Sequence, residues 1–342
     1  MILSQAPVRI TLGGGSTDLE SYYSKHGGFV IAAAIDRYCS ILASKRFYDS
    51  IRLSYSKMEI KNSVDDIEHP IFREALRFAG IKGGIELHSV ADVPANSGLG
   101  SSSSFTVALL NALHAYKKEG VTQKQLAEEA CHIEIDVLGE PIGKQDQYIA
   151  AFGGLTCLTF EKNGEVLVEP LRISDETMKQ LESNLIFFFT GEERRERSVR
   201  NASEILAEQD EKSRKNDLAM IQNLHRVKEI GLETRKYLEK GEVNKLGELL
   251  HTHWEIKKGR SDKMSDPFID ECYETARKNG ALGGKLIGAG GGGFFMFYCY
   301  NSDKPRLSEA MRKMGLKPQR FHFDFKGAKI LMNMKNSRMV KQ

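Results

Sequence analysis

The segment PANSGLGSSSSF (Pro94–Phe105) places two glycines before four serines, and an apolar stretch with helical spacing follows. Gly98 and Gly100 allow the backbone to come close to a ligand. A helix that begins at Ser101 leaves its first amide groups without partners, and such a helix start favours an anion. One serine would be enough for an ordinary helix cap, so the run of four indicates a phosphate site rather than a plain glycine turn. The Lys of a Walker A loop is absent, so we expect another type of phosphate loop.

Two carboxylates follow in the segment HIEIDVLGEPIGKQDQYIAAFGG (His132–Gly154). Helices are expected from about 123 to 136 and from about 144 to 151, which places Glu134 and Asp146 on different helices. Packing of these helices can bring both carboxylates to one site, where one would hold Mg²⁺ and the other would accept a proton. The alternative is a pair of surface carboxylates. A zinc deaminase is excluded because the PCxxC sequence that should accompany HxE is absent.

The N-terminal segment APVRITLGGGSTD (Ala6–Asp18) predicts a strand followed by three contiguous glycines. This spacing does not fit the GxGxxG pattern of a Rossmann fold, and the following segment is too short for its crossover helix. Arg9 lies within the expected strand, where an unpaired guanidinium is costly. We therefore expect Arg9 to face a cleft or a carboxylate, although a paired structural arginine is the alternative.

Two further features are less specific. The segment GGKLIGAGGGGFFMF (Gly283–Phe297) has four consecutive glycines, which indicate close approach to a ligand or another loop rather than a simple wide hairpin. In HTHWE (His251–Glu255) the two histidines are two residues apart and would point in different directions on a helix, so we expect a surface role for them.

The composition is that of an ordinary globular protein. The 342 residues are 41% hydrophobic and 28% charged, and the net charge of +3 gives no reason to expect binding to nucleic acid or a membrane. Five scattered cysteines without a CxxC pair favour a reducing compartment. No signal peptide or spanning segment is visible, so a cytoplasmic location is expected. A homodimer is compatible with these features.

The pattern of elements predicts an α+β protein of two domains. The first part is rich in strands, with helices from 101 to about 151. Amphipathic helices dominate from about 199 to 280, and the remainder returns to strand, helix and strand. We place the boundary shortly before Leu185, which gives domains 1–182 and 183–342.

Three of these segments, in this order, resemble the motifs of the GHMP kinase superfamily (galacto-, homoserine, mevalonate and phosphomevalonate kinases). The PxRxxLxGxxTD motif matches Pro7–Asp18, PxxxGLGSSxS matches Pro94–Ser104, and the glycine-rich motif matches Lys285–Gly293. The resemblance implies a ribosomal-S5-like N-terminal domain that binds ATP, a ferredoxin-like C-terminal domain, and an active site in the cleft between them. It also implies ATP and Mg²⁺ as cofactors.

The resemblance assigns roles by position. Asp146 would be the catalytic base and Arg9 would steady it or the transferred phosphoryl group, while Ser102 and Glu134 would hold Mg²⁺. The backbone that wraps the nucleotide phosphates would be that of Gly98, Leu99, Gly100, Ser101, Ser102 and Ser103. Asp18 would bind a sugar hydroxyl, next to Gly15, Ser16, Gly290 and Gly291.

The sugar is indicated by a departure from one branch of the family. The galactokinase sequence GEHTD is here GGSTD, with Gly15 and Ser16 in place of Glu and His. The strings RITLGGGSTDLESYY, GEPIGKQDQYIAAFGG and GALGGKLIGAGGGGFF are most similar to bacterial D-glycero-D-manno-heptose 7-phosphate kinases, which phosphorylate the anomeric hydroxyl on the way to GDP-heptose for surface glycans.

A phosphorylated heptose needs a second anion site. The candidates are Lys144 and the arginine-rich segment Arg194–Arg200, in which we single out Arg195. The kinase part of L-fucokinase is also similar, so a kinase for an unphosphorylated sugar such as fucose is the alternative. A catalytically silent regulator that binds sugar and nucleotide is a third possibility.

Overall fold

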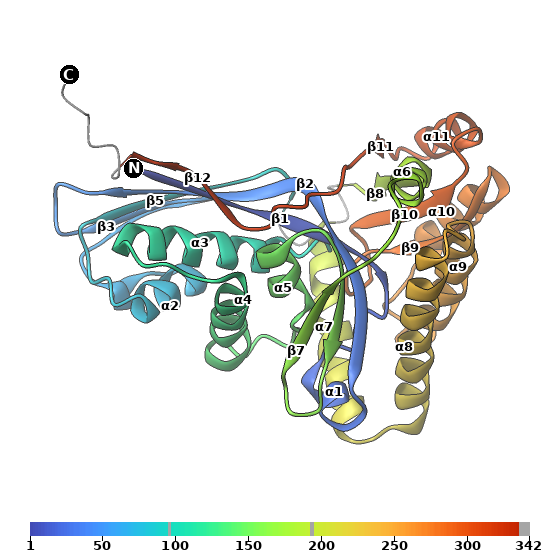
Figure 1. Ribbon diagram of the computed structural model, residues 1–342, viewed down its shortest axis with the longest axis horizontal. Helices are drawn as coiled ribbons and strands as arrows, with labels where there is room; N and C mark the ends of the chain where they lie inside the picture. The colour runs from blue at the N-terminus through green and yellow to red at the C-terminus, as the bar shows by residue number, and fades with distance from the viewer. Residues whose placement is uncertain (95–96, 192–194, 335–342) are drawn as a thin grey trace.

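The computed structural model describes residues 1–94, 97–191 and 195–334, without the side chains of 195–201. Its strands form two sheets (Figure 1). The larger sheet has the order β12-β1-β2-β5-β3-β4, and β6 and β7 extend from β2. Its strands are β1 (Ile2–Gly13), β2 (Gly28–Lys45), β3 (Ile51–Ser54), β4 (Met58–Lys61), β5 (Ile85–Ala91), β6 (Leu155–Phe160), β7 (Val166–Pro170) and β12 (Lys329–Asn333).

The long strand β2 organises the larger sheet. One end of it, from residue 39 to 45, pairs with β5, and the other end, from 28 to 33, pairs with β6. The sequence predicted two strands, 29–35 and 41–46, whereas the structure has one continuous strand. The residues between them stay extended because the pairing with β1 shifts register between Pro7 and Val8 instead of ending there.

Helices cover one face of this sheet (Figure 1). They are α2 (Pro70–Phe78), α3 (Ser101–Lys117), α4 (Gln123–Cys131) and α5 (Gln145–Phe152), and α3 packs directly on β1 and β2. The apolar residues between the helices and the sheet form the largest buried cluster, which includes Phe72, Leu109 and Ile149. The helices that carry the serine run and Asp146 are therefore fixed to the sheet that carries Arg9.

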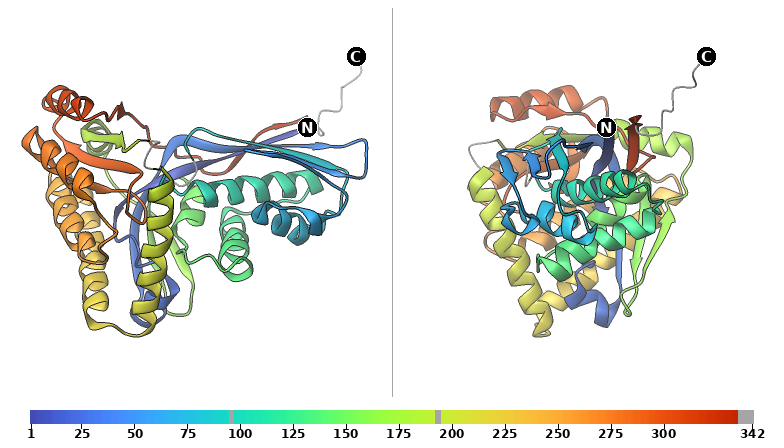
Figure 2. Two further views of the ribbon diagram at one scale, coloured as in Figure 1. Left: turned by 180° about the vertical axis from the view of Figure 1, so that it is seen from behind. Right: turned by 90° about the vertical axis from the view of Figure 1, so that its left-hand side faces the viewer.

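The second part of the chain builds a smaller sheet with the order β11-β8-β10-β9. Its strands are β8 (Leu185–Phe189), β9 (Ala281–Leu286), β10 (Phe294–Cys299) and β11 (Pro318–Gln319). The accompanying helices are α6 (Asp175–Asn184), α7 (Arg195–Arg214), α8 (Leu218–Glu239), α9 (Lys245–Lys258), α10 (Pro267–Lys278) and α11 (Lys304–Lys313). Seen from behind, α7 stands between the other helices of this second part and the helices under the larger sheet (Figure 2).

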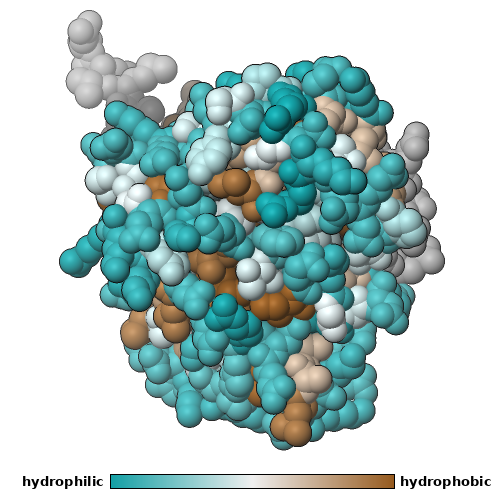
Figure 3. All heavy atoms as spheres, turned by 90° about the vertical axis from the view of Figure 1, so that its right-hand side faces the viewer, coloured by the Kyte–Doolittle hydropathy of each residue, from teal (hydrophilic) through white to brown (hydrophobic). Residues whose placement is uncertain are grey.

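The predicted amphipathic helices are confirmed. The buried residues of α10 are Ile269, Cys272, Tyr273 and Ala276, which recur at helical spacing and face the smaller sheet. The outer face of this part is covered mainly by hydrophilic side chains (Figure 3). No helix in the described part of the chain is long and apolar enough to cross a membrane.

The end of the chain returns to the larger sheet. Strand β12 pairs antiparallel with β1, with Ile2 opposite Asn333 (Figure 1). The change of sheet between β7 and β8 lies near the predicted boundary at 182, but the last strand does not stay with the second part. The division of the chain into two domains, 1–182 and 183–342, therefore stays a prediction.

Candidate active site

Two adjoining cavities lie where β1, α5 and the start of α3 face α9 and the loop after β9. They share Arg9, Asp146 and the loop Ile287–Ala289. The first cavity is lined in addition by residues of both parts of the chain, chiefly Thr11, Gly15, Ser16, Asp18, Gln145, His253, Lys257, Arg260 and Lys285. The second cavity is lined chiefly by Gly98, Gly100, Ser101, Ser102, Ser103, Glu134, Gly290 and Gly292. Arg9 and Asp146 therefore stand where the two cavities meet.

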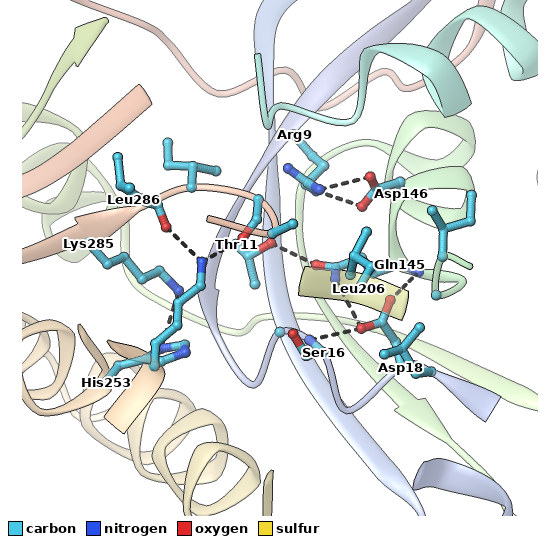
Figure 4. Close-up of a pocket in the computed structure, with 18 of the residues that line it drawn as sticks. Arg9, Thr11, Ser16, Asp18, Gln145, Asp146, Leu206, His253, Lys285 and Leu286 are labelled. Carbon is cyan, nitrogen blue, oxygen red and sulfur yellow. Dashed lines mark hydrogen bonds and ion pairs between the residues drawn. The ribbon is translucent and has the colours of Figure 1, made fainter. Parts of the chain in front are cut away.

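Arg9 and Asp146 form a bidentate ion pair (Figure 4). Arg9 Nε donates to Asp146 Oδ1 at 2.7 Å and Nη2 donates to Oδ2 at 2.8 Å. The third nitrogen of the guanidinium, Nη1, donates to the carbonyl oxygen of Gly98 at 2.5 Å. The expectation that the strand arginine meets a carboxylate is confirmed. Each oxygen of Asp146 keeps a second lone pair, and the side chain is 20% exposed to the cavities.

Asp18 is a second carboxylate of the first cavity, and it is almost fully buried. It accepts hydrogen bonds from the backbone amide of Ser16 and from both the amide and the side chain of Gln145 (Figure 4). The carbonyl of the Gln145 side chain in turn accepts from the Thr11 hydroxyl at 2.7 Å. Burial, and then the negative charge of Asp146, raise the pKa of Asp18. The Asp18 carboxylate is thus held in a fixed orientation beside the proposed base.

The serine run begins α3 as predicted. Gly100 adopts a left-handed conformation with φ of 75° immediately before the helix, so the amides of the first helical turn face the second cavity. A Cβ on Gly100 would lie 2.8 Å from Asp146 Oδ2, so any other residue here would displace the Asp146 carboxylate as well as carry the strain of a positive φ. Leu99 differs from its neighbours because its side chain is buried and its carbonyl accepts from the amide of Arg9.

Glu134 lies at the second cavity, beside the start of α3. Its oxygens accept from Ser102 Oγ at 3.0 Å and from Gln147 Nε2 at 2.7 Å. Burial raises the pKa of Glu134 to about 7, although these hydrogen bonds oppose the increase. The expected helix over 123–136 ends earlier, at Cys131, and continues as a π-helical turn over His132–Val137 that carries Glu134. The two carboxylates are brought to one site, as the sequence predicted.

The glycine-rich loop packs against the phosphate loop, backbone to backbone. A Cβ on Gly288 would lie 2.6 Å from Gly98 Cα, and a Cβ on Gly293 would lie 2.5 Å from the carbonyl oxygen of Ser97. The excess of glycine therefore reflects close contact between two loops. Gly290 lines the second cavity, whereas the amide of Gly291 donates to the carbonyl of Met264.

A group of basic side chains lines the first cavity, and two of them, His253 and Lys285, lie on the side opposite Asp18 (Figure 4). It consists of His253, Lys257, Arg260 and Lys285, called here the basic cluster, and each side chain comes from a residue that is 5% exposed or less. Burial, and then repulsion from Arg260 and Arg9, lower the pKa of Lys285 to about 7. The surface role expected for His253 is wrong, because the helix that carries it packs on the smaller sheet.

Of the two candidates for the second anion site, only Lys144 belongs to the described side chains, and it does not line either cavity. Lys144 Nζ donates to the carbonyl of Gly164 at 3.0 Å and lies over the ring of Tyr23, so it is directed away from both cavities. The segment 192–194 and the side chain of Arg195 lie outside the described residues.

Sequence reasoning missed the basic cluster, Gln145 and Thr11. One signal was available: His253, Lys257 and Arg260 are spaced by four and three residues, which places them on one face at the end of a helix. Such charged faces usually contact water, so the spacing alone did not indicate a buried site.

Comparisons with known proteins agree with this geometry. The model of the GHMP kinases N terminal domain matches residues 67–154, and that of the GHMP kinases C terminal matches 234–317. The D-glycero-alpha-D-manno-heptose 7-phosphate kinase of Campylobacter jejuni is 32% identical over 96% of this chain and 98% of its own. The galactokinase of Pyrococcus furiosus is 27% identical over 85% of this chain and 87% of its own.

The solved structures show the same fold. The crystal structure of a D-glycero-D-manno-heptose 1-phosphate kinase from Bacteroides thetaiotaomicron has a TM-score of 0.79 and 26% identity, and the match covers 97% of this chain and 99% of that one. The predicted α+β fold is thereby confirmed. The chain belongs to the GHMP kinases, which use ATP, and it is a sugar kinase that transfers a phosphoryl group to an alcohol.

Proposed function

We propose that this sugar kinase phosphorylates the anomeric hydroxyl of D-glycero-D-manno-heptose 7-phosphate with ATP and Mg²⁺, giving the 1,7-bisphosphate. One observation carries the proposal for the site: Asp146 stands where the two cavities meet, between the phosphate loop and the cavity that contains Asp18. A base in this position contacts an acceptor hydroxyl in the first cavity and faces a phosphoryl group in the second.

The second cavity is the proposed nucleotide side. The amides at the start of α3, from Ser101 to Ser103, would bind the phosphates, because they have no hydrogen-bond partner among the described residues and lie at the positive end of a helix dipole. Gly98 and Gly100 would let the phosphates come close to the backbone. Leu99 would contribute only by shaping the loop, since its carbonyl is already bonded to β1.

Asp146 would take the proton of the attacking hydroxyl. Arg9 holds both carboxylate oxygens in place, so the free lone pairs point in fixed directions, and positioning of this kind supplies much of the rate in phosphoryl transfer. The same guanidinium adds positive charge beside the point where charge builds up on the transferred group.

The residues present fit a magnesium ion. Ser102 and Glu134 offer a hydroxyl and a carboxylate 3.0 Å apart at the second cavity, and both are hard oxygen donors. The described part of the chain has no group of three or more His, Cys, Asp or Glu that could hold a metal, so phosphate oxygens and water would have to supply the other ligands. Mg²⁺ would neutralise charge on the nucleotide phosphates.

The first cavity is the proposed sugar side. Asp18 would accept a hydrogen bond from a sugar hydroxyl, next to Gly15 and Ser16, which replace the Glu and His of the galactokinase motif. The heptose is proposed because of the similarity to the Campylobacter jejuni kinase, which extends over nearly the full length of both chains.

The main alternative is a kinase for an unphosphorylated sugar. It is favoured by similarity to the L-fucokinase/L-fucose-1-P guanylyltransferase of Bacteroides fragilis, 26% identical over 92% of this chain but only 36% of that protein. A silent regulator is disfavoured because Arg9, Ser102, Glu134 and Asp146 are all present and placed at the two cavities.

The test is turnover of ATP with Mg²⁺ against D-glycero-D-manno-heptose 7-phosphate, sedoheptulose 7-phosphate, mannose, fucose and galactose. We expect the manno-heptose phosphate to be preferred, with the product phosphorylated at C1 by ³¹P NMR. Preference for fucose or another neutral sugar would replace the proposed substrate, and silence on the whole panel with intact ATP binding would favour the regulator.

A further inference from the structure

The basic cluster has no acidic partner in the described part of the chain. Lys257 Nζ donates to the carbonyls of Leu286 and Gly288, and Lys285 Nζ contacts His253 Nδ1 at 3.2 Å. The guanidinium of Arg260 is bonded to neutral side chains, those of Asn223, Ser16 and Gln209. No carboxylate of residues 1–94, 97–191 or 202–334 forms an ion pair with these cations.

Buried charge of one sign is costly without a counter-charge. Taking an ammonium or guanidinium out of water removes its hydration, and neighbouring cations add repulsion. Arg260 shows the missing counter-charge most directly, because its Nη2 is buried and has no hydrogen-bond partner among the described residues. A site that keeps such groups at the wall of a cavity is suited to an anion that enters the cavity.

The position of the basic cluster indicates which substrate carries the anion. All four residues line the first cavity, together with Asp18 and Asp146, and none of them lines the second cavity at the start of α3. Figure 4 shows Lys285 and His253 on the opposite side of the cavity from Asp18 and Asp146. The nucleotide phosphates have their own place beside the serine run, so the anion at the cluster belongs to the acceptor.

We propose that the basic cluster binds a phosphate ester carried by the sugar, at the end remote from the hydroxyl that faces Asp146. This inference rests on the proposed function, since it takes the first cavity as the acceptor site. Arg260 would supply its free Nη2 and Lys285 its ammonium, while Lys257 remains tied to the loop after β9. Lys144, which is directed elsewhere, has no part in this site.

The kinetic test compares one sugar with and without its phosphate. For the wild type, Lys285→Met and Arg260→Met, kcat/KM is measured with D-glycero-D-manno-heptose 7-phosphate and with the unphosphorylated heptose. We expect each variant to lose at least about tenfold on the phosphorylated sugar, the value of one hydrogen bond to a charged group. The loss on the unphosphorylated heptose should be clearly smaller, so that the ratio of the two kcat/KM values falls in each variant. Equal losses on both sugars would overturn the proposal, because the cluster would then act on the transferred phosphoryl group or on folding.

The matched control is Lys304→Met. Lys304 is also a buried lysine that donates to backbone carbonyls, those of Ser183 and Leu185, but it lies outside both cavities. Its replacement should cost stability without changing the ratio of the two kcat/KM values. A change of that ratio in this control would contradict the assignment to the basic cluster.

A binding test separates this proposal from the proposed function. With the β,γ-imido analogue of ATP and Mg²⁺ filling the second cavity, inorganic phosphate is titrated while thermal unfolding is followed. We expect phosphate to raise the melting temperature of the wild type, and the rise to be at least halved in Lys285→Met and Arg260→Met. No rise in the wild type overturns the anion site. A rise that needs these residues, from a protein that turns over no sugar on the panel, keeps the anion site and rejects the heptose kinase.

Discussion

The two walls of the first cavity differ in how their charges are balanced. On the wall built from β1 and α5, each carboxylate has donors from the protein itself: Arg9 for Asp146, and Gln145 for Asp18. On the opposite wall, the basic cluster has only neutral partners among the described residues. The first wall is organised before any ligand arrives, which suits groups that must hold an exact orientation during the reaction. The second wall leaves its charge for a ligand, which suits recognition.

We call the wall of β1 and α5 the balanced wall and the wall of the basic cluster the unbalanced wall. The largest effect is expected when the balanced wall loses its proposed base. Asp146→Asn keeps the size of the side chain but cannot accept the proton of the hydroxyl, so we expect kcat to fall about 100- to 10,000-fold. Nucleotide affinity, measured by calorimetry, should change little because the amides of Ser101–Ser103 are untouched. Turnover close to that of the wild type would show that Asp146 is not the base.

Loss of the carboxylate at the second cavity is expected to act through the metal. Glu134→Gln keeps the shape and the contacts to Ser102 and Gln147, but it removes the negative charge. We expect the Mg²⁺ concentration for half-maximal turnover to increase at least about tenfold. The control is Asp136→Asn, an exposed carboxylate on the same π-helical turn, which should leave the titration unchanged. An unchanged titration for Glu134→Gln would remove Glu134 from the metal site.

The balanced wall was largely predictable from the sequence, because its residues have strong local requirements. An arginine within a strand needs a carboxylate, and Asp146 provides it. Glycines before a serine run need a special backbone conformation, and Gly100 adopts it. These requirements are visible in short segments, so the residues of the proposed phosphate loop, the proposed base and the proposed metal ligands could be named from the sequence.

The unbalanced wall was not predictable, because tertiary packing decides it. His253 and Lys257 lie on α9, which would expose them if it stood alone, and they are buried only because α9 packs on β9. Lys285 comes from that strand, far along the chain, and no local pattern relates it to the helix. The same reason explains the wrong placement of Lys144: a basic residue close to Asp146 in sequence is directed to Gly164 instead.

A smaller effect is expected when the contact between the loop after β9 and the loop before α3 is broken. Gly288 has φ of +79°, and a Cβ there would meet the backbone of Gly98 at 2.6 Å. Gly315 has nearly the same φ, +82°, but nothing lies within 4 Å of its Cβ position. Both Gly→Ala variants carry the strain of a positive φ, about 1 kcal/mol, and only Gly288→Ala must also push two loops apart.

We therefore expect Gly288→Ala to lower the free energy of unfolding by about 1 to 3 kcal/mol more than Gly315→Ala and to raise the KM for ATP. Denaturant unfolding and initial rates measure the two effects. Equal destabilisation by the two variants would show that the loops separate without cost.

The smallest effect is a proton taken up by the unbalanced wall. Because burial and the nearby Arg260 and Arg9 hold the pKa of Lys285 at about 7, we expect this side chain to be mainly the neutral amine at pH 8 in the free protein. A phosphate dianion beside it, facing Arg260, Lys257 and His253 as well, favours the charged form and raises this pKa again. Binding at pH 8 should then take up about one proton or more, whereas the phosphate ester, with a pKa near 6, contributes almost none.

Calorimetry of heptose 7-phosphate binding in Tris and in HEPES, which differ in ionisation enthalpy, measures this uptake. Lys285→Met should reduce it by about one proton, and Lys304→Met, whose lysine lies outside the cavities, should leave it unchanged. The decisive quantity is the number of protons taken up on binding. A wall whose charges are already paired would exchange no proton when the sugar binds. No uptake in the wild type would mean that Lys285 is already charged before the sugar arrives, and the contrast between the two walls would then disappear. Equal uptake in the wild type and in Lys285→Met would mean that another group than Lys285 gains the proton.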